Sequence, residues 1–217
     1  MRFVNVITDT TRGRVNAILE RLPFGVNLTY TQSTPASLAA PNTAPYAAVL
    51  TGDRSLVLKR TADTTVTVAT IPFAVVEGQD KSIYAIGGAA SSAITPFVTV
   101  DTNPAAPATQ VRVRVVHLSP TAGNVDIFVT AVGADLAAAT PTLSNVAYRA
   151  VSGYLTVAPG TYQVRVVPAG TAPAQRAANV AINVAALALT GGTGRTIVAA
   201  DNARGGAPLQ AFVLSDR

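Results

Sequence analysis

A single histidine limits the acid–base chemistry available to this chain. His117 is the only histidine among 217 residues, and Ser119 and Asp126 follow it closely. A serine, a histidine and a carboxylate are the components of a hydrolase triad, in which the imidazole takes the serine proton. No Gly-x-Ser-x-Gly nucleophile elbow surrounds Ser152 or any other serine, however. We therefore interpret His117 as a histidine at the end of a strand, bonded to the turn that contains Ser119.

The residues that bind metals are too few and too scattered to predict a metal site. Zinc and copper sites need several cysteines or histidines, and the chain has no cysteine and one histidine. Calcium needs several oxygen ligands, including carboxylates. The segments Asp101–Asn103 and Asp201–Gly206 offer one carboxylate each, and we expect each to form an Asx turn, in which the side chain accepts a backbone N–H. We predict neither a metal nor a cofactor.

Two further kinds of reactive site are also disfavoured. Gly191–Thr196 contains glycines and a basic residue, but a phosphate-binding loop needs Gly-x-x-x-x-Gly-Lys-Ser/Thr between a strand and a helix. The context here is strand–turn–strand, so we expect a hairpin. The only glutamates, Glu20 and Glu77, lie in no acidic cluster that could hydrolyse a glycoside. The sequence therefore predicts a protein that is not an enzyme.

Three tyrosines of one segment remain as candidate contacts with a ligand or a partner. Tyr148, Tyr154 and Tyr162 lie within "YRAVSGYLTVAPGTYQVRVVPAGT". Aromatic rings can stack on sugars or on a protein surface. In the alternative interpretation, Tyr154 and Tyr162 lie at the edge of the core and their hydroxyls reach solvent or backbone.

The composition bounds the class of protein. Apolar residues make up 49% of the chain and charged residues 12%, about half the usual share. The chain therefore has enough apolar residues to form a buried core. Its surface must be largely neutral, which favours self-association. The net charge is +5, but no run of four basic residues with interleaved aromatics indicates nucleic-acid binding. No apolar run approaches the ~20 residues of a membrane span.

Short alternating segments predict an all-β protein. Apolar and polar residues alternate over Val111–Val116, Val125–Val129 and Thr161–Val167, with Pro and Gly between such runs. This pattern at regular spacing is typical of antiparallel β-sandwiches. Pro159–Gly160 is predicted to be a hairpin turn. Only Ala131–Ala139 and Arg14–Arg21 are expected to form short helical turns.

The chain is predicted to contain two tandem domains. A Pro-Ala-rich segment divides it into residues 1–101, a linker over 102–110, and residues 111–217. The halves share weak similarities in the same order, which indicates a duplication. The similar segments are Arg2–Thr10 and Val113–Thr121, Tyr46–Thr61 and the tyrosine segment, Thr67–Gly87 and Asn179–Asp201, and Thr95–Asp101 and Leu209–Asp216.

The second half resembles a known family. The segments "VRVVHLSPTAGNVDIFV", "LSNVAYRAVSGYLTVAPGTYQVRVVPAGT" and "GRTIVAADNARGGAPLQAFVLSD" are similar to the domain of unknown function 4397 family. The first half resembles it less: Asn5-Val6-Ile7 stands where His-Leu-Ser would be, and "LTGDR" where the Ser-Gly-Tyr element would be. We interpret the first half as a diverged copy.

The resemblance implies two immunoglobulin-like β-sandwiches in an exported bacterial protein. Members are often tethered as lipoproteins, so the resemblance implies an export signal, removed here, and allows for a lipid anchor upstream. It provides no catalytic residue to carry over. We expect a structural or interaction protein, displayed at the cell surface or forming an extracellular, even filament-like, assembly through sheet edges. Its partner would be a second copy, or a glycan or protein of the cell surface. The alternative is a carbohydrate- or cell-wall-binding module.

Overall fold

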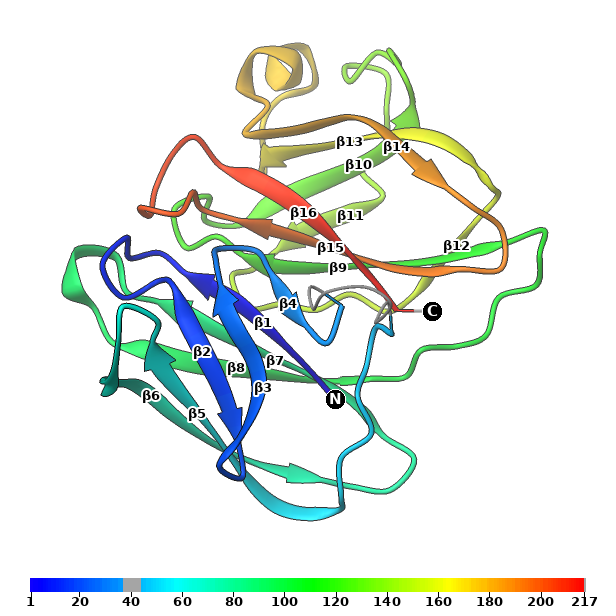
Figure 1. The fold of residues 1–217 in the computed structure, drawn as a ribbon. Helices are drawn as coiled ribbons and strands as arrows, with labels where there is room; N and C mark the ends of the chain where they lie inside the picture. Colours follow the sequence, from blue (N-terminus) through cyan, green and yellow to red (C-terminus); the bar gives the residue numbers. More distant parts are fainter. Residues whose placement is uncertain (37–43, 217) are drawn as a thin grey trace. The chain divides into compact units, whose positions relative to one another are not determined.

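The computed structural model describes residues 1–36 and 44–216 of the chain (Figure 1). The chain divides into two compact units, Met1–Asn103 with Ala203–Gly205, and Pro104–Asn202 with Gly206–Arg217. Each is described by itself below. Arg217, the end of the predicted second domain, lies outside the described residues. No helix among the described residues is long and apolar enough to cross a membrane.

The first unit consists of two four-stranded sheets. One sheet has the order β4-β1-β7-β8, with bounds Ser33–Thr34, Arg2–Ile7, Asp80–Gly87 and Ile94–Asp101. The other has the order β3-β2-β5-β6, with bounds Leu22–Leu28, Val15–Leu19, Gly52–Arg60 and Asp63–Val75. Alternate residues of both sheets, among them Phe3, Leu56, Ile71 and Ile83, form one buried apolar cluster. This is a β-sandwich, in which each sheet contributes its inner face to the core.

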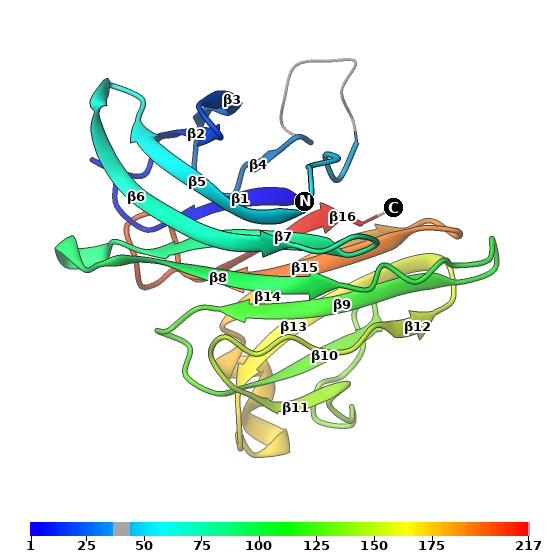
Figure 2. The ribbon, with the colours of Figure 1, turned by 90° about the horizontal axis from the view of Figure 1, so that it is seen from below.

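The second unit repeats this arrangement (Figure 2). Its first sheet has the order β12-β9-β15-β16, with bounds Leu155–Val157, Val111–Leu118, Gly194–Ala200 and Gln210–Ser215. Its second sheet has the order β11-β10-β13-β14, with bounds Leu143–Val146, Val125–Ala131, Gly160–Pro168 and Ile182–Leu189. Its own core contains Val113, Val115, Ile127, Val164 and Ile197. Short 3-10 helices lie at Ala89–Ser91 in the first unit and Pro173–Asn179 in the second.

The two units share their strand order, and the pairing of β1, β7 and β8 has the same register as that of β9, β15 and β16. β1 and β7 pair in parallel, as do β9 and β15, while the other pairs are antiparallel. Arg2 lies opposite Ser82 in the first unit, and Arg114 lies opposite Thr196 in the second. The predicted fold of two tandem, immunoglobulin-like β-sandwiches is confirmed. One parallel pair per unit departs from a purely antiparallel sandwich, because the first strand pairs with a strand that returns from the other sheet.

The register also corrects the alignment of the two halves. β5 and β13 are both 9 residues long and begin at Gly52 and Gly160. Counting back 6 residues from each glycine reaches Tyr46 and Tyr154. "LTGDR" therefore corresponds to "APGTY", and the tyrosine of the Ser-Gly-Tyr element is retained as Tyr46.

Neither predicted helical turn is a helix. Arg14–Arg21 contains β2 and a tight turn at Glu20 and Arg21, which have φ of 50° and 68°. Val15 and Ala17 point into the core, so the apolar residues follow the two-residue period of a strand. Ala131–Ala139 begins at the last residue of β10 and continues as turns. Its Leu136 is buried against Phe128, so the segment packs on the sandwich as a loop.

The two predicted hairpins are instead connections between sheets. Pro159–Gly160 joins β12 to β13, and the turn at Gly191–Gly192 joins β14 to β15. In both cases the flanking strands belong to different sheets. A crossing between the layers of a sandwich has the same strand–turn–strand sequence as a hairpin, which is why the pattern predicted the wrong pairing.

The predicted linker is largely part of the second unit. The division between the units falls between Asn103 and Pro104. The N–H of Gly192 lies 3.2 Å from the carbonyl oxygen of Pro107 and 2.9 Å from that of Gln110. A Cβ atom on Gly191 would lie 1.8 Å from the carbonyl oxygen of Ala108. Residues 107–110 are therefore fixed against the turn at Gly191–Gly192.

Candidate functional site

Tyr154 belongs to a buried polar cluster rather than to an open surface. The Nε of Arg114 donates to Oγ1 of Thr196 at 2.7 Å, and this hydroxyl lies 2.7 Å and 2.9 Å from the two carboxylate oxygens of Asp216. The Tyr154 hydroxyl donates to Oδ2 of Asp216 at 2.9 Å, and its ring lies 5.1 Å from the Arg114 guanidinium carbon. Arg114, Thr196 and Asp216 are all buried.

The first unit contains the same cluster at the corresponding positions. Arg2 donates from Nε to Oγ of Ser82 at 2.7 Å, and Ser82 donates to the carboxylate of Asp101. Tyr46 donates to Oδ2 of Asp101 at 2.7 Å and lies 4.7 Å under the Arg2 guanidinium. Thr99 adds a further hydroxyl at 2.6 Å from Oδ1 of Asp101.

These two clusters balance charge inside the fold. The guanidinium and carboxylate are 3.9 Å apart in the first unit and 4.0 Å apart in the second, with a hydroxyl joining them. A buried charge is tolerated when an opposite charge and hydrogen bonds compensate for lost water. The carboxylate of Asp101, for which the sequence predicts an Asx turn, accepts hydroxyl groups from Tyr46, Ser82 and Thr99.

Tyr162 makes a structural contact that its counterpart in the first unit also makes. Its hydroxyl donates to the carbonyl oxygen of Ala158 at 2.9 Å, and its ring packs against the second core. The corresponding Arg54 donates from Nε to the carbonyl oxygen of Leu50, also at 2.9 Å. Both side chains therefore fasten the turn that enters the strand. This agrees with the interpretation of Tyr162 as a core-edge residue.

Tyr148 is the candidate that stays open to a ligand. It is 36% exposed, and the Arg149 guanidinium lies 5.5 Å from the centre of its ring. An exposed ring beside a cation could stack on a sugar or a protein surface. Tyr30 is the corresponding residue of the first unit, because the N–H of Thr31 donates to the carbonyl oxygen of Asn5 as the N–H of Arg149 donates to that of His117.

His117 forms the contacts expected of a strand-end histidine. It is buried, its Nε2 donates to the carbonyl oxygen of Gly123 at 2.8 Å, and its Nδ1 faces the N–H of Ser119 at 3.5 Å. Asn5 corresponds to it in the first unit. Asn5 donates to the carbonyl oxygen of Gly13 at 2.6 Å and accepts from the N–H of Ile7 at 3.1 Å. The two residues therefore fasten the following loop in the same way.

The candidate triad partners of His117 form their side-chain hydrogen bonds with other groups. The Ser119 hydroxyl donates to Asp201, and Oδ1 of Asp126 accepts from the backbone N–H of Asn145 at 2.8 Å. Burial lowers the pKa of His117, while its bond to the Gly123 carbonyl and the charge of Asp201 oppose this shift. The imidazole is therefore neutral at pH 7 and has no activated nucleophile beside it.

Asp201 organises a loop of the second unit. Its carboxylate accepts from Thr121 at 2.7 Å and from the N–H of Gly206 at 2.8 Å, in addition to Ser119. The backbone contact resembles the predicted Asx turn but spans more residues. Within residues 1–36 and 44–216, no group of three His, Cys, Asp or Glu side chains could hold a metal ion.

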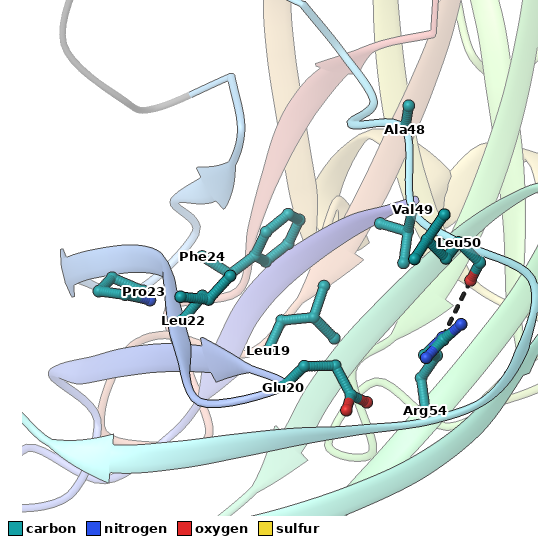
Figure 3. A pocket seen from close by; sticks show the side chains of 9 residues that line it. All are labelled: Leu19, Glu20, Leu22, Pro23, Phe24, Ala48, Val49, Leu50 and Arg54. Atoms are coloured by element: carbon teal, nitrogen blue, oxygen red, sulfur yellow. Dashed lines mark hydrogen bonds between the residues drawn. The ribbon is translucent and has the colours of Figure 1, made fainter.

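An apolar pocket that the sequence did not predict lies in the first unit (Figure 3). Its volume is about 320 Å³, and Leu19, Leu22 and Phe24 face Val49 and Leu50 across it. Leu22 is 69% exposed and Leu50 is 79% exposed. Glu20 and Arg54 are its charged neighbours. Such a pocket can accept an apolar group, and the apolar run in "ERLPFGV" is the signal that could have indicated it.

Each sheet has two edge strands, one that is short or irregular, here called the blunt edge, and one that we call the long edge. The blunt edges are the short strands β4, β12 and β11, of 2, 3 and 4 residues, and the irregular strand β3. The long edges are β6, β8, β14 and β16, of 13, 8, 8 and 6 residues. Their only charged residues are Asp63 and Asp101, and Asp101 is buried. Long neutral edges can accept a further strand.

Comparison with known proteins identifies a family for this chain. The family described as "Domain of unknown function (DUF4397)" matches residues 2–128 and 130–217, which together cover nearly all of the chain. The first match extends past the division between the units and ends on β10. No curated protein matches the chain.

Proposed function

Because the chain belongs to the DUF4397 family, which has no assigned activity, we propose a function from the described geometry. The protein is a non-enzymatic structural or interaction protein of bacteria. It acts at the cell surface or in an extracellular assembly, where it associates through the edges of its sheets. Its location outside the cell is what the family resemblance implies.

The observation that carries this proposal is the set of long, nearly uncharged edge strands. Soluble β proteins commonly protect such edges with charged side chains, lysine above all. Here β14 and β16 carry no charged residue, and β6 carries one, Asp63, at its first position. Backbone N–H and C=O groups along such an edge can bind a further strand without specific side chains.

The contacts of the histidine and the buried aspartates support the proposal that the protein is not an enzyme. His117 and Asp201 hold loops, and Asp101 and Asp216 compensate buried arginines. An active site brings such groups together around a space where a substrate can bind. The apolar pocket contains only Glu20 and Arg54 as charged groups, and Glu20 accepts from the N–H of Ser55 at 3.3 Å.

The test is the state of association of the full chain. Light scattering and electron microscopy over a series of protein concentrations should reveal dimers, larger assemblies or filaments. Because the contact is neutral, association should persist in high salt, whereas contacts between exposed charges weaken. A chain that remains monomeric at the highest soluble concentration would contradict the proposal. Cell fractionation of the source bacterium tests the location separately.

Tyr148 favours a second candidate, a carbohydrate- or cell-wall-binding module. Its exposed ring is the kind of surface on which a sugar stacks, and Arg149 could donate to sugar hydroxyls. Binding to a glycan array or to purified cell wall should disappear in Tyr148→Ala and persist in Val132→Ala, which changes an exposed loop residue. Absence of binding by the unaltered chain would remove this candidate.

A further inference from the structure

We infer that β16 is the edge through which two copies of this chain pair, strand against antiparallel strand. This inference rests on the proposed function and specifies which edge and which partner it uses. Two four-stranded sheets of the order β12-β9-β15-β16 would then join at β16 into one continuous sheet. Such a contact is isologous, because both copies contribute the same strand.

The four long edge strands differ in how regularly their backbone groups could form hydrogen bonds with another strand. β6 contains Pro72 and has register shifts where it pairs with β5. β14 has a register shift opposite the segment between Tyr162 and Val164. β8 is regular but contains Pro96. Prolines and bulges interrupt the hydrogen bonds of an edge. β16 alone among these four strands has neither, and it pairs with β15 over 6 residues without a shift.

The proline of β8 shows which backbone N–H groups of β16 point away from β15 and can bind a further strand. Pro96 lies opposite Ala85, and Ala211 lies opposite Ala199 at the corresponding position of the second unit. A proline within a paired edge strand must turn its nitrogen away from its neighbour, since it has no N–H to donate. By the same geometry the N–H of Ala211 points away from β15. Val213, two residues on, repeats this direction, so the two N–H groups form a row.

The side chains of β16 suit a neutral partner strand. The strand reads Gln-Ala-Phe-Val-Leu-Ser and has no charge to repel its own copy. Val213 is 37% exposed although it belongs to a sheet. Pairing of two β16 strands would cover Val213 and would place Phe212 and Leu214 beside apolar side chains of the second copy. Cross-strand contacts between aromatic and branched side chains stabilise a sheet.

A second copy is the partner that these features favour. A partner recognised by charge would need charged residues along the edge, and β16 has none. Every copy presents the same regular strand, with the same twist, so two copies match without any adjustment. The pairing also saturates β16, which limits the contact to two chains. Filaments would then need a second edge, such as β14.

The first test moves the proline of the first unit into the second. Ala211→Pro should fold, because Pro96 occupies the same place in β8. In sedimentation equilibrium of the full chain, we expect the unaltered protein to dimerise. Ala211→Pro should weaken the dimer roughly tenfold or more, because the change acts on both copies. Ala211→Ser, which keeps the N–H, should dimerise as the unaltered chain does.

A charge on the edge provides an independent variant. Val213→Lys places two like charges together across the contact and should also yield monomers. Val132→Lys is the matched control, because Val132 is 56% exposed and lies in a loop beyond the end of β10. Circular dichroism of each variant should retain the strand signal and a cooperative thermal transition.

A covalent trap locates the contact directly. The chain has no cysteine, so Val213→Cys introduces one unique thiol. A short bismaleimide should link two copies of Val213→Cys and leave Val132→Cys monomeric. If the unaltered chain associates and Ala211→Pro and Val213→Lys do not weaken it, the β16 contact is wrong while association through other edges stands. If the unaltered chain is monomeric, both proposals fail.

Discussion

The two units of this chain retain the same buried charge cluster and differ in their loops and edges. Arg2, Ser82, Asp101 and Tyr46 correspond to Arg114, Thr196, Asp216 and Tyr154 in position and in contacts. Burial explains why this part is the same in both, because a lone charge inside a protein is costly. Edges and loops face water, where substitutions are tolerated.

Two positions retain a contact although the residue differs. Asn5 and His117 both donate to a glycine carbonyl of the loop that follows their strand. Arg54 and Tyr162 both donate to the carbonyl four residues earlier in the chain. The fold therefore requires a donor at a given point and accepts several side chains that supply one. A comparison of residue types alone would miss this equivalence.

A clear difference lies at the connection after the second strand of each unit. In the first unit a tight turn at Glu20 and Arg21 joins β2 to β3 and leaves the apolar pocket beside it. In the second unit a longer loop joins β10 to β11, and Arg165 donates to the Ala134 carbonyl at 2.7 Å. Arg176 also holds this loop, through the Ala139 carbonyl at 2.8 Å.

The largest expected effect comes from breaking either charge cluster. Asp216→Ala removes the carboxylate opposite the buried Arg114 and should lower the free energy of unfolding of the second unit by about 3–5 kcal/mol. Asp101→Ala should do the same to the first unit through Arg2. Urea unfolding followed by circular dichroism measures both. Asp53→Ala, at an exposed position of β5, is the control and should change stability by no more than about 0.5 kcal/mol.

A smaller effect distinguishes the turns that lead into β7 and β15. Gly191→Ala would press a methyl group against the Ala108 carbonyl, so the second unit should lose roughly 1–3 kcal/mol of stability. The corresponding residue of the first unit is Glu77, whose side chain is exposed. Glu77→Ala should therefore leave stability nearly unchanged. Equal losses in both variants, in thermal or urea unfolding, would show that the two turns are packed alike.

The pH dependence of stability should differ between the units because of His117. Its pKa is lowered in the folded protein relative to the ordinary value of 6.5, so the unfolded chain binds the proton more readily. The stability that this supplies is complete above pH 6.5 and is lost as the pH falls below it. His117→Asn, which copies Asn5, should retain the bond to the loop and remove this dependence. Urea midpoints from pH 7.5 to 5 measure it.

The smallest effect concerns the edge that Pro96 protects. In the Ala211→Pro background, Pro96→Ala restores an N–H to β8 and should bring back part of the lost association. The gain should be smaller than the loss caused by Ala211→Pro, because β8 also carries Asp101 at its end. Sedimentation equilibrium compares the two. Full recovery of dimerisation would mean that the two edges are interchangeable.

The sequence predicted the fold class because alternation is a local property. Val111–Val116 and Thr161–Val167 alternate and are strands. It failed at Pro159–Gly160 and Gly191–Thr196, because pairing depends on which sheet the next strand joins, and this is set by contacts distant in sequence. Arg14–Arg21 was misread because a short strand followed by a tight turn has too few residues to distinguish the two periods.

The candidate site was less predictable than the fold. His117 could be interpreted because its neighbours lacked an elbow motif, and its contacts agree with that interpretation. Tyr154 could not, since its partner Asp216 lies 62 residues later in the chain. The apolar pocket depends on Leu22 and Leu50, which come together only when β2, β3 and the segment before β5 are in place. Exposed apolar residues carry no periodic signal.

The position of the charge clusters has a consequence for synthesis of the chain on the ribosome. In each unit the arginine lies on the first strand and the aspartate on the last strand or directly after it, as Arg2 with Asp101 and Arg114 with Asp216. A nascent unit cannot neutralise its arginine until nearly all of its residues have been translated. The first strand of each unit likewise cannot form its parallel pairing until β7 or β15 has been translated. Each unit should therefore stay open during elongation and close late, in one cooperative step.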